Sequence, residues 1–378
     1  MRIAHLSDTH IGYSQYNLAE RRKDFFLAFT QAIERIIEEQ VDIVVHSGDL
    51  FESSQPDINS LSVVINSLKL LKDKGIPFVA IMGNHDRVLR KGKMPPHKIL
   101  EELGLLTFIG GGKPWGSVVV KDLFIAGIHF APKLYMEHVL NEGVLNRFSE
   151  EAASFSGSLF LFHQGVDIYL PFESAFEISL SDLPPGFSYY AGGHIHIFAK
   201  EKVFDGLFSY AGATEFRSVK EAALDNRGFN IFNLSDGSLN RVKLENLREF
   251  LIFDISEGEE DTVLKEVYDT VLEKKQPPVV TIRYSYLDKP FSFDRELFKK
   301  IQERALIVRV IQKEIAEKKE LQGVSETVSL EKIVEDYFKG QKKVVRELAK
   351  EIALSPSEQI QGILSNFIRE STGLDIDF

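Results

Sequence analysis

The chain has 378 residues, of which 44% are hydrophobic, and a formal net charge of −11. This length can bury a sizeable core and suffices for two or three domains. The chain has no cysteine, which excludes disulfides and thiolate metal sites, so any metal must be held by nitrogen and oxygen ligands. The acidic balance argues against a generally basic surface, so any contact with nucleic acid must be local.

The amino terminus, MRIAHLSDTH, enters a strand-like apolar run at once, without the basic region and long apolar region of a leader peptide. No uninterrupted apolar stretch approaches the roughly 20 residues that span a bilayer. We therefore expect a soluble cytoplasmic protein with no membrane partner.

Short apolar strands alternate with helical stretches from residue 1 to about 234, which is typical of an α/β layered domain. Residues 17–40 form an expected crossover helix, because Phe25, Phe29, Ile33 and Ile36 recur at helical spacing. An expected hairpin at Asp236-Gly237 completes a first domain of residues 1–246. The expected strands of this domain are 2–6, 42–47, 77–82, 123–128, 158–163 and 187–193.

The second expected helix, residues 56–74, carries more apolar residues than one stripe on a helix holds. One face should pack on the sheet. The remaining apolar residues, represented by Leu61, Val64 and Leu68, are either buried within the same subunit or form a homodimer interface.

Residues 247–314 are predicted to form a small separate α/β domain without catalytic residues. Its expected order is strand, helix, strand, helix, strand, at 248–256, 259–275, 277–287, 293–303 and 305–312.

A polar linker at 315–328 leads to a helical tail at 329–378. The two amphipathic tail helices either form a self-contained hairpin or dock on a partner. Their apolar residues are Leu330, Ile333, Val334, Tyr337, Phe338, Ile360, Ile363, Leu364 and Phe367.

Five polar clusters each follow an expected strand. Since ligands bind beyond the carboxyl ends of strands in an open α/β sheet, clusters delivered to one edge predict a site. Each cluster alone also fits a surface turn or a buried core histidine. Two of them have side chains two residues apart, a spacing that puts both on one face of an extended chain. The clusters are Asp8-Thr9-His10, Gly48-Asp49, Gly83-Asn84-His85-Asp86, His163 and Gly192-Gly193-His194-Ile195-His196.

The clusters together offer more nitrogen and oxygen ligands than one ion takes, and they suit two divalent cations, with Mn²⁺ or Fe favoured over Mg²⁺. An aspartate can supply one oxygen to each of two ions, and such a pair activates water and holds phosphoryl oxygens. The predicted reaction is therefore hydrolysis of a phosphoester. The candidate ligands are Asp8, His10, Asp49, Asn84, His163, His194 and His196.

The motifs D-x-H, G-D, G-N-H-D and G-H-x-H, with one histidine between the last two, resemble those of the calcineurin-like metallophosphoesterase superfamily. HLSDTHIGYSQYN, HSGDLFESSQP, MGNHDR, FHQG and YYAGGHIH are more closely similar to archaeal members of one branch, the meiotic-recombination-eleven nucleases (SbcD type) of double-strand-break repair. The resemblance covers about the first 230 residues densely. It implies a four-layer sandwich of two sheets flanked by helices, followed by a DNA-binding capping domain and an ATPase-binding segment.

Carried over residue by residue, the resemblance implies two Mn²⁺ per subunit. Asp8, His10 and His196 would hold one ion, Asn84, His163 and His194 would hold the other, and Asp49 would bridge them. His85 would be the catalytic imidazole, which stabilises the transition state or protonates the leaving oxygen. Relatives often have a histidine three residues after the bridging aspartate; this chain has Glu52 there, so Glu52 is left out of the predicted catalytic set.

The function implied by the resemblance is a Mn²⁺-dependent DNA nuclease, a 3′-5′ double-strand exonuclease and single-strand endonuclease associated with the nucleoid. It would act as a homodimer with an SMC-like ABC ATPase (Rad-fifty, SbcC type) docked on residues 325–378. Two alternatives stay open: a small-substrate phosphodiesterase or protein phosphatase of the same superfamily, and a mainly structural subunit that holds ATPase heads near DNA. GDLFESS lacks the Asp and Arg-Gly that protein phosphatases place after their GD.

DNA contacts are predicted in two loops. The first offers hydrogen-bonding and aromatic groups; the second is basic and also fits a solvated loop. The predicted DNA-binding residues are Tyr13, Gln15, Tyr16, Asn17, Arg87, Arg90, Lys91 and Lys93.

Overall fold

The computed structural model describes residues 1–314, apart from 89–92, 171–174, 225–226, 288–291 and 293. The expected linker and tail lie outside the described residues, and with them every residue predicted to bind an ATPase, from Leu330 to Phe367. Arg90 and Lys91 of the predicted DNA-binding loop also lie outside them.

Two six-stranded mixed sheets carry the first domain. In the first sheet the order is β12-β11-β1-β2-β3-β4, with β1 to β4 parallel and the β11–β12 hairpin antiparallel at one edge. Its strands are β1 (Arg2–Leu6), β2 (Ile43–Ser47), β3 (Phe78–Ile81), β4 (Thr107–Phe108), β11 (Gly228–Asn233) and β12 (Ser238–Lys243). The hairpin predicted at Asp236-Gly237 is confirmed.

The second sheet has the order β5-β6-β7-β8-β10-β9, in which β6, β7, β8 and β10 are parallel. Its strands are β5 (Trp115–Val120), β6 (Leu123–Ile128), β7 (Ser158–Phe162), β8 (Tyr189–Gly192), β9 (Ala199–Val203) and β10 (Gly206–Tyr210). The pairing register places Phe162 opposite Gly192, so β7 and β8 end side by side.

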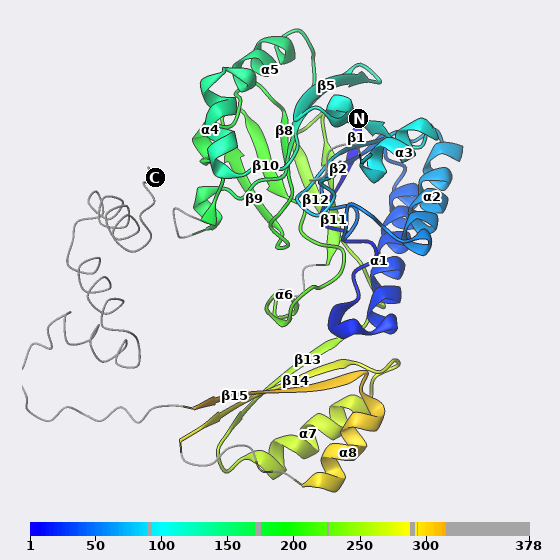
Figure 1. The fold of residues 1–378 in the computed structure, drawn as a ribbon, viewed down its shortest axis with the longest axis vertical. Helices are drawn as coiled ribbons and strands as arrows, with labels where there is room; N and C mark the ends of the chain where they lie inside the picture. The colour runs from blue at the N-terminus through cyan, green and yellow to red at the C-terminus, as the bar shows by residue number, and fades with distance from the viewer. Residues whose placement is uncertain (89–92, 171–174, 225–226, 288–291, 293, 315–378) are drawn as a thin grey trace, which may run out of the picture. The chain divides into compact units, whose positions relative to one another are not determined.

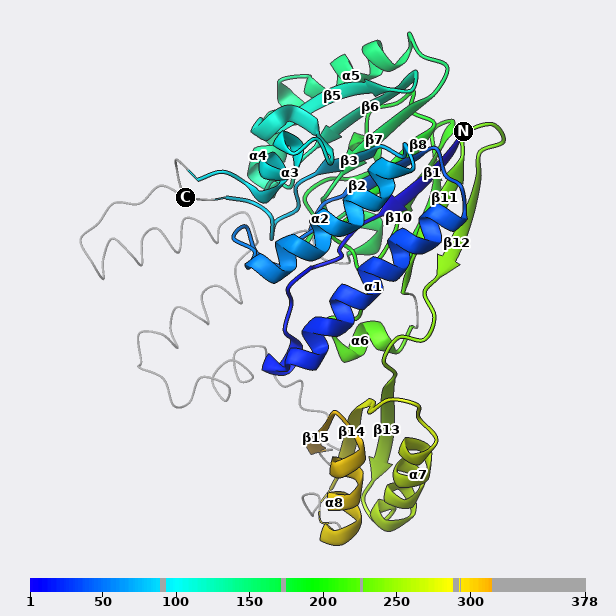
Figure 2. The ribbon, with the colours of Figure 1, turned by 90° about the vertical axis from the view of Figure 1, so that its right-hand side faces the viewer.

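The sheets pack face to face, and helices cover their outer faces (Figures 1 and 2). Strand β2 shows why: Ile43 and Val45 enter the core between the sheets, whereas Val44 points to the outer core under α1 and α2. The result is the predicted four-layer α/β sandwich. The helices of this domain are α1 (Ala19–Glu38), α2 (Ile58–Asp73), α3 (Pro96–Glu102), α4 (Lys133–Asn141), α5 (Val144–Ala152) and α6 (Val219–Ala222).

Helix α2 begins at an Asp57 cap, whose carboxylate accepts the backbone N–H groups of Asn59 and Ser60. Val64 and Leu68 are fully buried in the core shared by α1, α2 and the first sheet. The prediction that these two side chains form a dimer surface is therefore wrong, because the sheet and α1 already cover them. Leu61 is partly buried against the same core.

Residues 250–314 form the predicted strand-helix order around a core of their own. The parallel strands β13 (Phe250–Ser256), β14 (Val279–Tyr286) and β15 (Ile307–Glu314) make one sheet, and α7 (Glu260–Leu272) and α8 (Arg295–Arg304) pack on it. Leu264, Val267, Ile282 and Ile301 are buried there.

A buried ionic cluster joins this sheet to α1. Arg248, just before β13, binds the Asp24 carboxylate through Nε at 2.7 Å, and Arg21 reaches the same carboxylate at 2.5 Å. The Arg21 guanidinium also lies 4.8 Å from the ring centroid of Phe250. Among the described residues, no helix is long and apolar enough to cross a membrane.

Candidate dinuclear metal centre

The predicted ligands leave the carboxyl ends of five strands that belong to both sheets. Asp8 and His10 follow β1, Asp49 follows β2 and Asn84 follows β3 in the first sheet. His163 follows β7 in the second sheet, and the pair His194 and His196 follows β8. The site thus lies where two sheets meet, rather than at the edge of one sheet as the alternation of strands and helices alone suggests.

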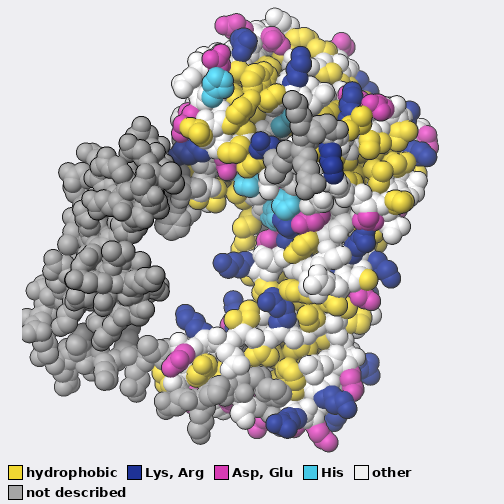
Figure 3. Space-filling model, in the orientation of Figure 1, with side chains coloured by type: hydrophobic (Ala, Val, Ile, Leu, Met, Phe, Trp, Pro, Cys, Tyr) yellow, Lys and Arg dark blue, Asp and Glu magenta, His cyan; other side chains and the backbone are white. Residues whose placement is uncertain are grey.

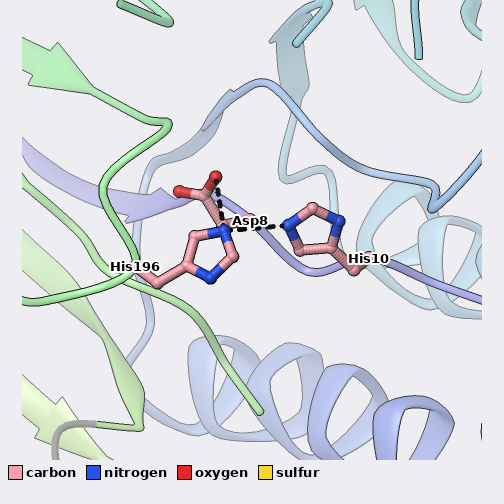
Figure 4. Close-up of side chains that lie close together, drawn as sticks. All are labelled: Asp8, His10 and His196. Atoms are coloured by element: carbon pink, nitrogen blue, oxygen red, sulfur yellow. Dashed lines mark hydrogen bonds and ion pairs between the residues drawn. The ribbon is translucent and has the colours of Figure 1, made fainter. Parts of the chain in front are cut away.

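Asp8, His10 and His196 converge on one point (Figure 4). The Nε2 atoms of His10 and His196 are 3.1 Å apart, and Oδ1 of Asp8 lies 3.7 Å from Nε2 of His196. Asp8 and His10 are fully buried. Two nitrogens and a carboxylate oxygen that face each other at such distances are arranged to hold a cation.

Asn84, His163 and His194 form the second group. Oδ1 of Asn84 lies 3.2 Å from Nε2 of His163 and 3.2 Å from Nδ1 of His194. His194 and His196, two residues apart, thus lie in different groups, and that they hold different ions stays a prediction.

Asp49 lies between the two groups. Its Oδ2 is 3.7 Å from Nε2 of His10 and 3.3 Å from Nε2 of His163. The other oxygen, Oδ1, accepts the backbone N–H of His85 at 2.8 Å. A carboxylate oxygen that faces histidines of both groups fits a ligand shared by two ions, and the donor set of nitrogen and oxygen suits hard to borderline divalent cations. The structure therefore contains a candidate dinuclear metal site.

The buried carboxylates of the site attract positive charge. Although burial lowers it, the carboxylates of Asp49 and Asp8 raise the pKa of His163 to about 9. Burial and the neighbouring His163 lower the pKa of His194 to about 3. Burial raises the pKa of Asp8. Buried carboxylates that draw a proton onto a neighbouring imidazole would be neutralised equally well by divalent cations.

The local backbone of the ligands is unusual. The φ angles of Asp8, His10, Asp49 and His194 are 53°, 44°, 55° and 90°. Left-handed backbone at a non-glycine residue stores strain that the surrounding structure must hold in place. Here the N–H of Asp8 donates to the carbonyl of Gly48 at 3.1 Å, and the N–H of His10 donates to that of Asp49 at 3.0 Å. The expectation that extended backbone brings Asp8 and His10 onto one face is therefore wrong, although both side chains do reach the site.

Two glycines allow the close approach of these loops. A Cβ on Gly193 would collide with the carbonyl oxygen of Ser47, and one on Gly48 would collide with the His163 ring. The same carbonyl of Ser47 accepts Nδ1–H of His163 at 2.6 Å. This bond keeps the proton on Nδ1 and directs Nε2 of His163 at Asp49 and Asn84, so Nε2 would be the atom that exchanges its proton for a metal.

Two acidic residues that sequence reasoning missed position the ligands. The carboxylate of Asp86 accepts the backbone N–H groups of Leu50, Phe51 and Gly83, at 3.1, 2.9 and 3.1 Å, and so ties the loop after β2 to the loop after β3. Oε1 of Glu221 lies 3.2 Å from Nδ1 of His196 and orients its Nε2 toward the first group. Asp86 belongs to the quoted GNHD motif; Glu221 carries no sequence signal, because it comes from a distant helix.

His85 lies beside the ligands with its side chain 26% exposed. Its Nδ1–H donates to the carbonyl of Glu52 at 3.0 Å, so Nε2 carries the lone pair. The carboxylate of Glu52 lies 3.0 Å from Nδ1 of His10 and accepts a hydrogen bond from Arg217 at 3.0 Å. Glu52 is thus placed at the edge of the centre.

The residues predicted to bind DNA are distributed unevenly. Gln15 is 2% exposed and uses its amide group internally, donating to the carbonyl of Arg217 and accepting from Arg21. The prediction that Gln15 contacts DNA is therefore wrong. Tyr13 packs edge-on against Phe25, and Tyr16 lies under Arg309 of β15.

The remaining members of the set lie at the surface. Asn17 and Arg87 are exposed. Arg87 and Lys93 line a cavity of about 320 Å³ whose wall includes Gly83 and Phe130, next to the second ligand group. Figure 3 shows histidine side chains reaching the surface beside acidic and basic ones. The positively charged side chains of Arg87 and Lys93 therefore lie close to the candidate metal centre.

Residues 1–198 match the family model of the calcineurin-like phosphoesterases. The chain belongs to this family, and within it to the branch of the Mre11 proteins. It is accordingly an enzyme that hydrolyses phosphoesters.

Three archaeal relatives named DNA double-strand break repair protein Mre11 document the branch. The one from Methanococcus maripaludis is 36% identical over 296 residues, which cover 73% of this chain and 76% of that protein. The one from Saccharolobus solfataricus is 39% identical over 58% of this chain and 56% of its own length. The one from Methanocaldococcus jannaschii is 31% identical over 82% of this chain and 83% of its own length.

Proposed function

We propose that the chain is a manganese-dependent DNA nuclease that cleaves phosphodiesters as a 3′-5′ double-strand exonuclease and a single-strand endonuclease. The observation that carries the proposal is the convergence of seven nitrogen and oxygen ligands in two groups with Asp49 between them. The named relatives, all repair proteins, favour DNA as the substrate. Association with the nucleoid is part of the same proposal.

The position of each residue in the site suggests its role in hydrolysis. Asp8, His10 and His196 would hold one cation, Asn84, His163 and His194 the other, and Asp49 both. Two cations so placed would activate a water and withdraw charge from the phosphodiester. His85, once its Nε2 at the open edge has taken a proton from solvent, would give that proton or a hydrogen bond to the leaving oxygen. Mn²⁺ is favoured because the ligands mix imidazole nitrogens with oxygens.

The nuclease assay tests the proposal directly. End-labelled duplex and single-stranded DNA is incubated with the full chain and, side by side, Mn²⁺, Mg²⁺, Fe²⁺ or no metal. We expect nucleotide release with Mn²⁺, little with Mg²⁺ and none without metal. Hydrolysis of bis(4-nitrophenyl) phosphate without any DNA degradation would instead support a small-substrate phosphodiesterase. Binding of DNA without hydrolysis of either substrate would support a structural subunit.

A docked SMC-like ABC ATPase is the second part of the proposal. It rests on the amphipathic pattern of the tail and on the resemblance. Deleting residues 325–378 should abolish association with the ATPase in a pull-down and preserve Mn²⁺-dependent hydrolysis. Unchanged association would remove the tail from the interface.

A homodimer is the third part. Helix α2 supports it with Ile58, which is 86% exposed and lies one turn before the partly buried Leu61, and with Leu70, which is 46% exposed further along the helix. Leu61→Asp should convert a dimer to a monomer in a solution mass measurement, whereas Leu134→Asp, at an 80% exposed leucine on α4, should not. A monomeric mass for the unaltered chain would rule the dimer out.

A further inference from the structure

The guanidinium group of Arg217, in the loop between β10 and α6, lies at the edge of the candidate metal centre. Its Nη1 donates toward Nε2 of His85 over 3.3 Å, and its Nη2 donates to Oε1 of Glu52 at 3.0 Å. The side chain is 22% exposed. A permanent cation therefore stands beside the imidazole proposed to act on the leaving oxygen, with access to solvent.

The backbone of Arg217 is held on both sides. Its N–H donates to Oε2 of Glu221 at 2.8 Å, and its carbonyl accepts from Nε2 of Gln15 at 2.7 Å. Glu221 also contacts the predicted ligand His196, and Gln15 is buried. The guanidinium lies 4.7 Å from the ring centroid of Tyr13. The backbone of Arg217 is thus fixed relative to the ligands, and the side chain it carries stays within reach of a substrate bound there.

The hydrogen bonds of Arg217 leave donor capacity unused. Its Nε is buried and has no hydrogen-bond partner among the described residues. Within the described part of the chain, the acceptor near Nη1 is an imidazole nitrogen, which is a weaker acceptor than an anion. A guanidinium presents donors in a planar fork that matches two oxygens of a phosphate. A phosphate oxygen at this edge would be the better acceptor.

We propose that Arg217 is a phosphate-binding residue of the active site. When a phosphodiester enters, the guanidinium leaves Nε2 of His85 and donates to a non-bridging phosphate oxygen, while Glu52 keeps it within reach. Nε2 of His85 is thereby freed to take a proton from solvent and to deliver it to the leaving oxygen. Glu52, the partner of Arg217, stands at the sequence position where relatives often have a histidine. The inference rests on the proposed phosphodiester hydrolysis, and it does not require that the diester be DNA.

The first test compares Arg217→Gln with Lys220→Gln, which removes an exposed positive charge from the neighbouring helix α6. The substrates are bis(4-nitrophenyl) phosphate and end-labelled DNA, both with Mn²⁺, and bound Mn²⁺ is measured separately by elemental analysis. Arg217→Gln should raise KM and lower kcat/KM by about 10²-fold on both substrates, with the Mn²⁺ content unchanged. Lys220→Gln should have the same KM, kcat/KM and Mn²⁺ content as the unaltered chain. Equal rates for the two variants, or loss of Mn²⁺ from Arg217→Gln, would overturn the assignment.

A second pair of variants separates phosphate binding from a merely structural ion pair. Arg217→Lys keeps the charge without the fork and should recover part of the lost kcat/KM. The double variant Glu52→Gln/Arg217→Gln should stay as impaired as Arg217→Gln. If the double variant instead regains full activity, Arg217 serves only to neutralise Glu52, and the proposal fails.

The design also keeps this inference apart from the proposed nuclease activity. Hydrolysis of the small diester that depends on Arg217, with no DNA cleavage, would refute the nuclease and retain the phosphate-binding role. DNA cleavage that does not depend on Arg217 would support the nuclease and refute the phosphate-binding role of Arg217. In anisotropy titrations on DNA with metal omitted, loss of one phosphate contact should reduce the slope of log affinity against log salt by about one for Arg217→Gln.

Discussion

The backbone N–H of His85 donates to Oδ1 of Asp49 at 2.8 Å. One carboxylate oxygen thus holds the loop of the proposed catalytic imidazole while the other faces His10 and His163. The position of His85 is therefore tied to the same residue that we propose both ions share. The roles of the two residues can be separated by substituting their side chains, because the bond uses the backbone of His85.

His85→Ala should abolish nucleotide release and leave the Mn²⁺ content intact, because its side chain is proposed to touch the leaving oxygen and its backbone bond to Asp49 survives the change. The expected loss in kcat is about 10²–10⁴-fold. The control is His138→Ala, an exposed histidine on α4, which should change neither quantity. A loss of bound metal that parallels the loss of activity would assign His85 to the ligands instead.

Asp86→Asn should destabilise the fold and weaken metal binding together. The carboxylate accepts three backbone N–H groups, and an amide in its place presents a donor to at least one of them. The expected cost is about 2–4 kcal/mol in the free energy of unfolding, measured with urea, with reduced Mn²⁺ affinity by calorimetry. Asp269→Asn, exposed on α7, is the control. Normal stability and affinity in Asp86→Asn would show that the two loops do not need this bridge.

Asp57→Ala should cost about 1 kcal/mol through loss of the α2 cap. Burial acts to raise the pKa of Asp57, but hydrogen bonds from Ser60 and the nearby Arg22 and Asn59 lower it below its ordinary value. A lowered pKa in the folded chain means that folding favours the carboxylate. The stability that this carboxylate contributes is complete when the pH is above its ordinary pKa. It is lost as the pH falls through the lowered pKa of the folded chain.

The difference in unfolding free energy between the unaltered chain and Asp57→Ala should therefore be constant near neutral pH and shrink below about pH 4. Asp73→Ala, which removes an exposed carboxylate from the other end of α2, is the control for the loss of the cap. A difference that grows at low pH would contradict the sign of the shift.

Leu68→Ala should cost about 2–5 kcal/mol, because this leucine is fully buried in the core under α2. Leu134→Ala, at an 80% exposed leucine on α4, should change stability by less than about 0.5 kcal/mol. Urea unfolding measures both. If Leu68→Ala left the free energy of unfolding unchanged but altered the number of subunits, Leu68 would belong to an interface instead of the core.

Much of the fold follows from local patterns. The strands that end in Leu6, Ser47, Ile81, Phe162 and Gly192 are recognisable because apolar runs stop at polar clusters. Those clusters also reveal the ligands, since short strands deliver the residues that follow them to one end of a sheet. Local patterns do not show that the ligand-bearing strands are divided between two sheets, because parallel pairing joins segments that are distant in the chain.

Other features depend on tertiary packing. The apolar excess of α2 is ambiguous in sequence, and only its packing beside α1 shows that Val64 and Leu68 belong to the core. Gln15 is polar like a surface residue, and its burial depends on partners at Arg21 and Arg217. Arg217 itself lies far from every motif and reaches the centre only because its loop folds over His85.

The left-handed backbone at Asp8, His10, Asp49 and His194 has a consequence for how such a site persists. Each of these residues costs the folded chain about 1–3 kcal/mol relative to a residue suited to that conformation. Glycine at any of the four positions would relieve this strain and remove a predicted ligand. A chain that still carries all four has the residues of a working enzyme, because a purely architectural role would be served better without them.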